Sequence, residues 1–251
     1  MLVMGILNVT PDSFADGGKH NDFESAVARG LQMIAEGVDI IDIGGESTRP
    51  GADRVSEEEE IARTIPVITE LAKHGVKMSI DTMRASTAKA AIDAGASIIN
   101  DVSGGLADPI MLQTAAALKV PYIEMHWRGQ SKDMNSKAIY GDVVNDVISE
   151  LQERIDAALD AGIAKDNLII DPGLGFAKDA DHNWAIIDAI DQFVAMGYPV
   201  LVGASRKRFL GGDSPDEREQ ATIDLTKRLA PTGVWAVRVH SVKPHKEVLT
   251  V

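Results

Sequence analysis

The sequence predicts a single (β/α)₈ barrel over residues 1–251, and three observations support this fold. Eight short apolar runs alternate with longer segments of helical period along the whole chain. Six glycines separate the end of a helical segment from the next run: Gly37, Gly75, Gly95, Gly162, Gly197 and Gly233. A length of 251 residues also suits one barrel of this kind. An open doubly wound sheet is the alternative, but no Gly-x-Gly-x-x-Gly motif follows the first run to support a dinucleotide fold.

The eight runs are expected to be buried parallel strands. They are apolar at consecutive positions, which is typical of a parallel sheet covered on both faces. In chain order they are residues 2–7, 38–43, 76–80, 97–99, 120–125, 167–170, 198–202 and 234–239.

The segments between the runs have the spacing of amphipathic helices. The first is expected to bury one face made of Phe23, Ala26, Val27, Leu31 and Ile34. The second opens with Ser56 and Glu59 in a capping-box pattern. Glycine at the junctions can adopt the left-handed conformation that ends a helix, and only the junction before residue 120 lacks one. Eleven residues follow His240, which predicts a short final helix.

Composition excludes several classes of function. The net charge of −13 argues against binding to nucleic acid or to an anionic membrane. The absence of cysteine excludes disulfides, thiolate zinc sites and cysteine nucleophiles. No stretch approaches the roughly 18 apolar residues that a membrane span requires. We therefore expect a soluble, cytoplasmic protein.

Polar side chains follow the predicted strands, where the active site of such a barrel forms. Asp81, Asn100 and Asp171 end three runs, and Lys207 lies in the loop after the seventh. Buried amides and carboxylates need hydrogen-bond partners, so together these residues suit a flat, nitrogen-rich heterocycle. For Asp81 alone, a role as a helix N-cap explains the residue equally well.

Positive charges near the same end predict an anion site, formed from Arg49, Arg206, Lys207, Arg208 and Arg238. Arg206 and Arg208 are individually better explained as solvated loop residues. Arg238 and His240 are two positions apart, so both side chains lie on one face of the last strand. Asn8 offers a neutral oxygen that could hold Mg²⁺ against a phosphate. His126 remains ambiguous, and the other histidines are expected on loops or helix surfaces: His20, His74, His182 and His245.

The strand-end motifs, taken in order, resemble those of the dihydropteroate synthase family. The motifs are Gly5-Ile-Leu-Asn-Val-Thr-Pro-Asp-Ser-Phe14, Asp42-Ile-Gly-Gly-Glu-Ser-Thr-Arg-Pro50, and residues 79–81, 100–104, 171–176, 203–207 and 238–240. The resemblance spans the chain and implies a barrel that is usually a homodimer. It also implies a reaction that joins 6-hydroxymethyl-7,8-dihydropterin diphosphate to 4-aminobenzoate and releases diphosphate.

The same resemblance implies a role for each matched residue. The pterin ring would be held by Asp81, Asn100, Asp171 and Lys207, with Met125 and Phe176 nearby. The diphosphate would be bound by Thr48, Arg238 and His240, and Asn8 would contact Mg²⁺. The 4-aminobenzoate site would be shaped by Phe14, Arg49, Pro50 and Ser205. The catalytic residues would be Asn8, Lys207, Arg238 and His240.

Two other functions remain open at this point. One is a non-catalytic paralogue that binds pterin without turnover, which the short C-terminal segment suggests. The other is a pterin-binding methyltransferase domain, which would not need the Ser205-Arg206-Lys207 and Arg238-x-His240 anion site.

Overall fold

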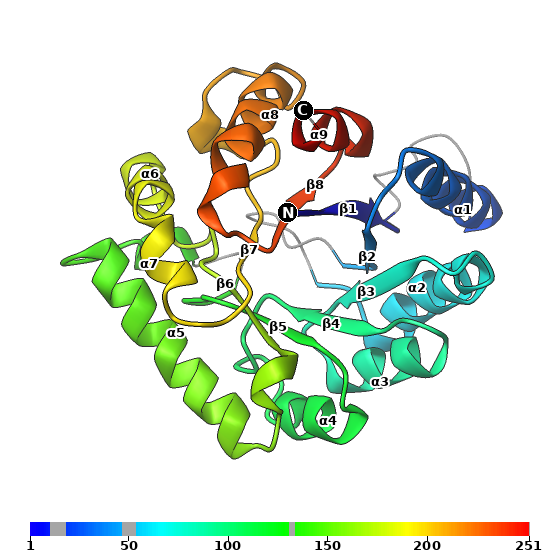
Figure 1. Ribbon diagram of the computed structural model, residues 1–251. Helices are drawn as coiled ribbons and strands as arrows, with labels where there is room; N and C mark the ends of the chain where they lie inside the picture. Colours follow the sequence, from blue (N-terminus) through cyan, green and yellow to red (C-terminus); the bar gives the residue numbers. More distant parts are fainter. Residues whose placement is uncertain (11–18, 47–53, 131–133, 251) are drawn as a thin grey trace.

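The computed structural model describes residues 1–10, 19–46, 54–130 and 134–250. Eight parallel strands form a barrel surrounded by helices (Figure 1). The strands pair in the order β6-β5-β4-β3-β2-β1-β8-β7, and a bridge between Ile170 and Val200 joins the two ends of this series. The predicted (β/α)₈ barrel is confirmed. The strands are β1 (Leu2–Asn8), β2 (Ile40–Gly44), β3 (Lys77–Asp81), β4 (Ile98–Asp101), β5 (Tyr122–Met125), β6 (Leu168–Asp171), β7 (Leu201–Val202) and β8 (Ala236–Val239).

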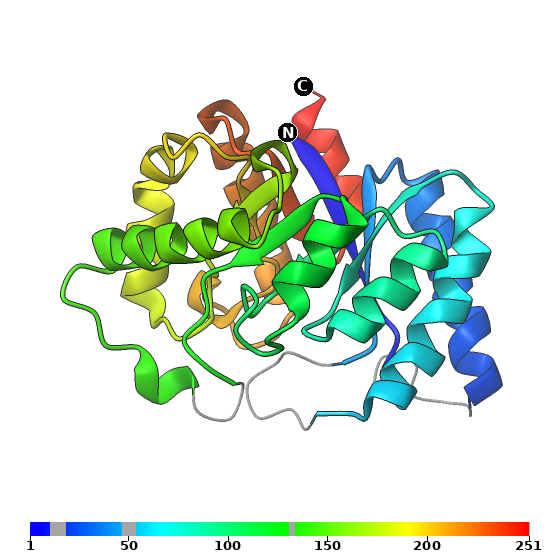
Figure 2. The same cartoon turned by 90° about the horizontal axis from the view of Figure 1, so that it is seen from below.

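Helices fill the connections between successive strands and pack around the outside of the barrel (Figure 2). They are α1 (Lys19–Ala35), α2 (Glu57–Ala72), α3 (Ala85–Asp93), α4 (Met111–Leu118), α5 (Val143–Asp160), α6 (Ala180–Asp188), α7 (Ile190–Val194), α8 (Glu217–Leu229) and α9 (Val242–Leu249). Short 3₁₀ turns are η2 (Met134–Lys137), η3 (Lys165–Asn167), η4 (Arg208–Leu210) and η5 (Ala230–Thr232). None of these helices, within the described ranges, is long and apolar enough to cross a membrane.

The predicted junction glycines all have the left-handed backbone that ends a helix. Their φ angles run from +70° at Gly75 to +118° at Gly95. At the junction without a glycine, Lys119 adopts φ +56° and caps α4 in the left-handed conformation. A side chain there costs roughly 1–2 kcal/mol, which the packing of α4 and β5 must offset. Ser56 caps α2 as predicted, since its Oγ accepts a hydrogen bond from the Glu59 amide at 3.2 Å.

The structure corrects two details of the helices. Leu31 is 36% exposed, whereas the rest of the predicted face of α1 packs on the core, and Gly30 and Met33 are buried as well. The i, i+3/i+4 spacing in α1 is compatible with several overlapping helix faces. Packing against the strands determines which of these faces is buried. His245 is fully buried in α9 rather than on a helix surface, with its Nδ1 2.7 Å from Thr226 Oγ1.

The short α9 does not prevent closure of the barrel. β8 pairs with β1 on one side and with β7 on the other. Val242 is fully buried, and its Cγ2 would lie 3.0 Å from a Cβ placed on Gly5 of β1. The small Gly5 therefore lets α9 pack closely on the first strand, so eight helical residues are enough to cover this part of the sheet.

The barrel interior is apolar at one end and polar at the other. Seven strands each contribute one side chain to an inner cluster, namely Met4, Ile40, Ile98, Ile123, Ile169, Leu201 and Ala236. Successive strand side chains alternate between the two faces of the sheet. The residues two and four positions further along these strands therefore also point inward, nearer the carboxyl ends. Half of them are polar, and these polar residues form the candidate site.

Candidate active site

An inward-facing carboxylate, Asp42 of β2, organises the polar end of the barrel. Asp42 is fully buried and accepts hydrogen bonds from Ser79 Oγ at 2.5 Å, Asn100 Nδ2 at 3.1 Å and Arg238 Nε at 2.6 Å. Arg238 Nη2 donates to Asp81 Oδ2 at 2.7 Å. Four strands are thus linked through one buried network. The sequence motifs contained Asp42 without giving it a role, although its position two residues before Gly44 already places it on the inward face.

The charges in this network shift the pKa values of one another. Burial raises the pKa of Asp81 to about 7, the Arg238 guanidinium opposes this shift, and the charge of Asp42 adds to it. Burial disfavours the charged form of Arg238, but Asp42 and Asp81 more than compensate and raise its pKa. Arg238 has five N–H donors and uses two of them here. The remaining donors leave it able to bind an anion as well.

Asp171 and Lys207 form a second charged group at the same rim. The Asp171 carboxylate accepts from the Gly173 amide at 2.7 Å, and Lys207 Nζ donates to the Leu174 carbonyl. Burial raises the pKa of Asp171, which the charge of Lys207 opposes. Burial also lowers the pKa of Lys207 to about 8, which Asp171 opposes.

The two groups meet at Gly203, which follows β7. A Cβ placed on Gly203 would lie 3.7 Å from Asp171 Oδ2 and 4.0 Å from Arg238 Cβ. Residues more than 60 positions apart in the sequence therefore share one rim. The predicted convergence of Asp81, Asn100, Asp171 and Lys207 is present in the structure, and the side chains form a mixed donor and acceptor surface.

Ser205 and His240 lie beside this surface and are bonded to each other. Ser205 Oγ accepts from the His240 amide at 3.2 Å and lies 2.9 Å from His240 Nδ1. A hydroxyl group can donate one hydrogen bond while it accepts another, so Ser205 can donate to Nδ1 while it accepts from the amide. In that arrangement the imidazole carries its proton on Nε2. This arrangement would orient a donor suited to a phosphate oxygen.

The neighbouring arginines differ from each other in their surroundings. Arg206 has φ +58°, and its Nε donates to Glu219 Oε2 at 2.6 Å and its Nη2 to Ser241 Oγ at 2.9 Å. It is therefore part of the structure of the loop rather than a solvated residue. Arg208 is exposed, as expected.

Apolar side chains form the wall next to Asp171. Met125 is buried in a cluster with Met83 and Val102, and Phe176 packs against this cluster. Lys207 Nζ lies 4.7 Å from the centre of the Phe176 ring. There is thus an apolar wall beside the polar groups at the place where the family resemblance implies that a flat ring would lie against Met125 and Phe176.

Asn8 ends β1, half-buried and paired in register with Gly44. Within the described ranges, no group of three or more histidine or acidic side chains could hold a metal ion. The amide oxygen of Asn8 is of the ligand type that Mg²⁺ uses together with the oxygens of a substrate.

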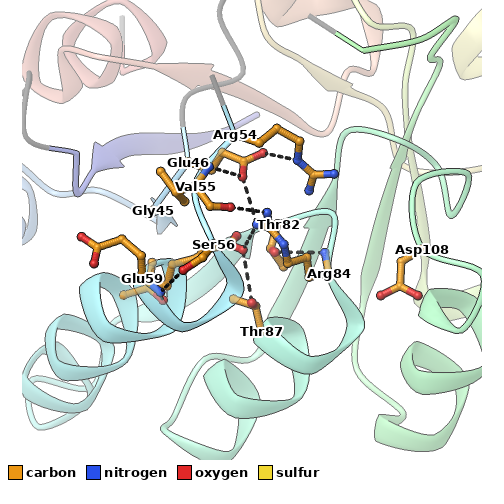
Figure 3. Close-up of polar contacts among 12 residues, drawn as sticks. Gly45, Glu46, Arg54, Val55, Ser56, Glu59, Thr82, Arg84, Thr87 and Asp108 are labelled. Carbon is orange, nitrogen blue, oxygen red and sulfur yellow. Dashed lines mark hydrogen bonds and ion pairs between the residues drawn. The ribbon is translucent and has the colours of Figure 1, made fainter. Parts of the chain in front are cut away.

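Four residues predicted to contact substrates lie outside the described residues: Phe14, Thr48, Arg49 and Pro50. Three of them, Thr48, Arg49 and Pro50, come between Glu46 and Arg54 in the sequence. Glu46 and Arg54 belong to one hydrogen-bonded cluster, shown in Figure 3. Arg84 donates to Glu46 Oε2 at 3.0 Å, to Glu60 Oε2 and to the Val55 carbonyl at 2.6 Å. Glu46 also accepts from Arg54 Nε at 3.0 Å. The sequence did not single out this cluster, because its members come from three separate elements.

Comparisons with known proteins agree with this geometry. Residues 4–240 match the family described as pterin binding enzyme. The dihydropteroate synthase of Mycobacterium leprae is 49% identical, with 99% of this chain and 91% of that protein covered. The Bacillus subtilis dihydropteroate synthase is 47% identical, with 96% and 84% covered.

Solved structures give the same result. The Xanthomonas albilineans dihydropteroate synthase with 4-aminobenzoic acid superposes with a TM-score of 0.94 at 44% identity, covering 99% of this chain and 90% of that one. The same enzyme in complex with 7,8-dihydropteroate gives 0.90 at 40% identity, covering 99% and 91%. The family match over residues 4–240, together with these identities, shows that this chain belongs to the pterin binding enzyme family. The relatives compared above are dihydropteroate synthases.

Proposed function

We propose that this chain makes dihydropteroate from 6-hydroxymethyl-7,8-dihydropterin diphosphate and 4-aminobenzoate, with release of diphosphate, as a step of folate biosynthesis. The observation that carries the proposal is the meeting of two sites at one rim. One is the polar surface of Asp81, Asn100, Asp171 and Lys207, and the other is the pair Arg238 and His240, which would bind the diphosphate. The activity of the similar proteins supports the same reaction.

The pterin ring would be held by groups of both hydrogen-bonding types. The carboxylate of Asp171 can accept from the ring N–H and amino groups, and Lys207 can donate to a ring nitrogen or oxygen. Met125 and Phe176 would exclude water from the ring faces. Asp171 is buried and Lys207 is half-buried, so water satisfies their hydrogen bonds only in part. A ligand that supplies the matching partners is therefore favoured over one that does not.

In the reaction, the C–O bond between the pterin methylene and the diphosphate breaks, and its electron pair leaves with the diphosphate. The lone pair of the aniline nitrogen forms the new C–N bond, and that nitrogen then loses a proton. Arg238 and the Nε2–H of His240 would stabilise the charge on the departing group. No general base is required, because the amine is already neutral at pH 7.

We further propose that Mg²⁺ assists the reaction, held by Asn8 and by substrate oxygens. When bound, the ion would neutralise part of the diphosphate charge. Removal of metal with EDTA should abolish product formation, and added Mg²⁺ should restore it. Full activity in EDTA would contradict the proposed requirement.

The direct test uses purified protein, both substrates and Mg²⁺, with detection of dihydropteroate and diphosphate. We expect diphosphate release that depends on 4-aminobenzoate. Failure to bind either substrate would contradict the proposal. Pterin binding without product would instead support the non-catalytic paralogue, and methyl transfer from methyltetrahydrofolate would support the methyltransferase.

The family resemblance also supports a homodimer that works in the cytoplasm. Light scattering of the purified protein measures the first property, because a dimer would have twice the mass of the 251-residue chain. Fractionation of the source cells measures the second.

A further inference from the structure

A buried ammonium group lies against the loop that follows β6. Lys178 is 8% exposed, and its Nζ lies 2.8 Å from His126 Nδ1 and 3.1 Å from the carbonyl oxygens of both Gly173 and Phe176. Three acceptors thus surround the nitrogen, which matches the three donors of an ammonium group. The reaction proposed above does not use Lys178 or His126.

The hydrogen bonds determine which groups carry protons. Glu150 Oε2 lies 2.9 Å from His126 Nε2 and also accepts from Arg128 Nε at 2.9 Å. Partial burial raises the pKa of Glu150, but the hydrogen bonds from His126 and Arg128 lower it to about 2, so the group is a carboxylate. The imidazole proton must then lie on Nε2, and Nδ1 is left to accept from Lys178.

Burial and the neighbouring charges agree with this assignment. Burial, reinforced by the charge of Lys178, lowers the pKa of His126 to about 4, so the imidazole is neutral. Burial also lowers the pKa of Lys178 to about 7, which Asp171 and Glu150 oppose and Lys207 and Arg128 reinforce. The proton on Lys178 therefore depends on the acceptors around it.

The carbonyls that Lys178 holds belong to the loop that supports Lys207. The Leu174 carbonyl accepts from Lys207, and the Phe176 ring lies 4.7 Å from Lys207 Nζ. A Cβ on Gly173 would lie 2.4 Å from the His126 carbonyl oxygen, so this loop packs directly on the chain after β5. Any shift of the loop would therefore move the Leu174 carbonyl that accepts from Lys207 and the Phe176 ring that lies beside Lys207.

Lys178 also acts on Asp171 through its charge. Burial raises the pKa of Asp171, and the charge of Lys178 is among those that oppose the shift, together with Lys207 and Arg238. An ammonium at position 178 therefore favours the ionised Asp171 that would accept from the pterin ring.

We propose that Lys178, hydrogen-bonded to the His126 ring that Glu150 orients, is a positioning residue for the pterin half of the site. It fixes the carbonyls of Gly173 and Phe176 and so keeps Lys207, Phe176 and Asp171 in their binding arrangement. This inference rests on the proposed function, because it specifies which substrate depends on Lys178.

The main test compares Lys178→Met with Lys246→Met. Lys246 is the control, since it is also a hydrogen-bonded lysine but binds Asp39 just before β2, at the opposite end of the barrel. Lys178→Met should raise the KM for the pterin diphosphate by about tenfold, as expected for about 1.4 kcal/mol, with less than a twofold change for 4-aminobenzoate. Calorimetry with 6-hydroxymethylpterin should show the same loss of affinity. Lys246→Met should change neither value.

The outcomes separate this inference from the proposed function. Wild-type protein that forms no dihydropteroate would contradict the function, while the pterin titrations would still test Lys178. Active wild-type protein with unchanged pterin affinity in Lys178→Met, or with equal losses for both substrates, would overturn the inference.

A second variant covers the case in which Lys178→Met does not fold. Glu150 lies on the outer helix α5, and the variant Glu150→Ala removes the acceptor that orients His126. It should weaken pterin binding about threefold, and unchanged affinity would overturn the inference. In wild-type protein, ¹⁵N NMR should show His126 neutral at pH 6 with its proton on Nε2; the opposite tautomer would also overturn it.

Discussion

Lys207 illustrates how burial prepares a residue for binding. Its ammonium lies among Asp171, the Leu174 carbonyl and the Phe176 ring, and burial lowers its pKa to about 8. At pH 7 the group therefore remains charged, but water compensates it poorly. A ligand acceptor that reaches this charge should consequently bind with more energy than it would at an exposed lysine.

Lys207→Ala should weaken pterin binding more than 4-aminobenzoate binding. Loss of one charged hydrogen bond is worth about 1.5–3 kcal/mol, or at least a tenfold rise in Kd for 6-hydroxymethylpterin. Calorimetry with each ligand measures the difference. Lys227→Ala on the exposed face of α8 is the control and should leave both affinities unchanged. Equal losses for the two ligands would contradict the predicted role.

Glu124 presents the opposite case, a buried acid without a hydrogen-bond partner among the described residues. Burial raises its pKa to about 8, against the opposing charge of Arg154. The folded protein thus holds a proton that the unfolded chain releases near pH 4.5. The contribution of this group to stability is complete below that pH and is lost as the pH rises through about 8.

Glu124→Gln should remove this pH dependence, because the amide stays neutral. Relative to wild type, the free energy of unfolding of the variant should rise by more than about 1 kcal/mol between about pH 5 and pH 9. Urea titrations at several pH values measure the difference. A constant difference between the two proteins across this range would show that Glu124 ionises normally.

At the scale of elements, the cluster around Arg84 joins β2, α2 and α3 (Figure 3). Glu60 is 1% exposed and receives hydrogen bonds from Arg84 and from Thr87 Oγ1 at 3.2 Å. Removing the arginine would leave a buried carboxylate without its counter-charge. Breaking a buried ion pair in this way lowers the free energy of unfolding much more than breaking an exposed ion pair does.

Arg84→Met should lower the free energy of unfolding by about 3 kcal/mol. Lys89→Met is the control, since Lys89 pairs with Asp93 at the surface, and it should cost less than about 1 kcal/mol. The double variant Arg84→Met with Glu60→Gln should recover part of the loss, because the buried charge is then absent. Equal stability of the single and double variants would contradict this explanation.

At the scale of the whole molecule, α9 and β1 bring the two ends of the chain together. Figure 2 shows both termini at the same end of the barrel. Val242 is fully buried against the backbone of Gly5. The short last helix therefore belongs to the same packed unit as the first strand.

Val242→Ala should destabilise the protein by about 2 kcal/mol, because it removes two buried methyl groups and leaves a cavity. Unfolding followed by circular dichroism and by tryptophan fluorescence should show one shared transition at lower urea. An unchanged midpoint, or an earlier separate transition for α9, would contradict the idea of a single cooperative unit.

Much of this fold could be predicted from local sequence. Eight apolar runs, helical spacing between them and glycines at six junctions were sufficient for a barrel, because each feature depends on neighbours within a few residues. Leu31 and His245 were misplaced, since their burial depends on which distant surface packs against the helix. Lys119 could not be identified as the remaining left-handed junction, because lysine seldom adopts this conformation and its local sequence does not mark it.

The sequence by itself determined which residues reach the rim, because strand alternation and strand ends are local properties. Only the tertiary structure decided their partners. It linked Asp42 to Arg238 across 196 positions and Lys178 to His126 across 52. These pairings, and the pKa shifts of Asp81, Lys178 and Lys207, arise from burial and from distances between charges. Both quantities exist only once the barrel has closed.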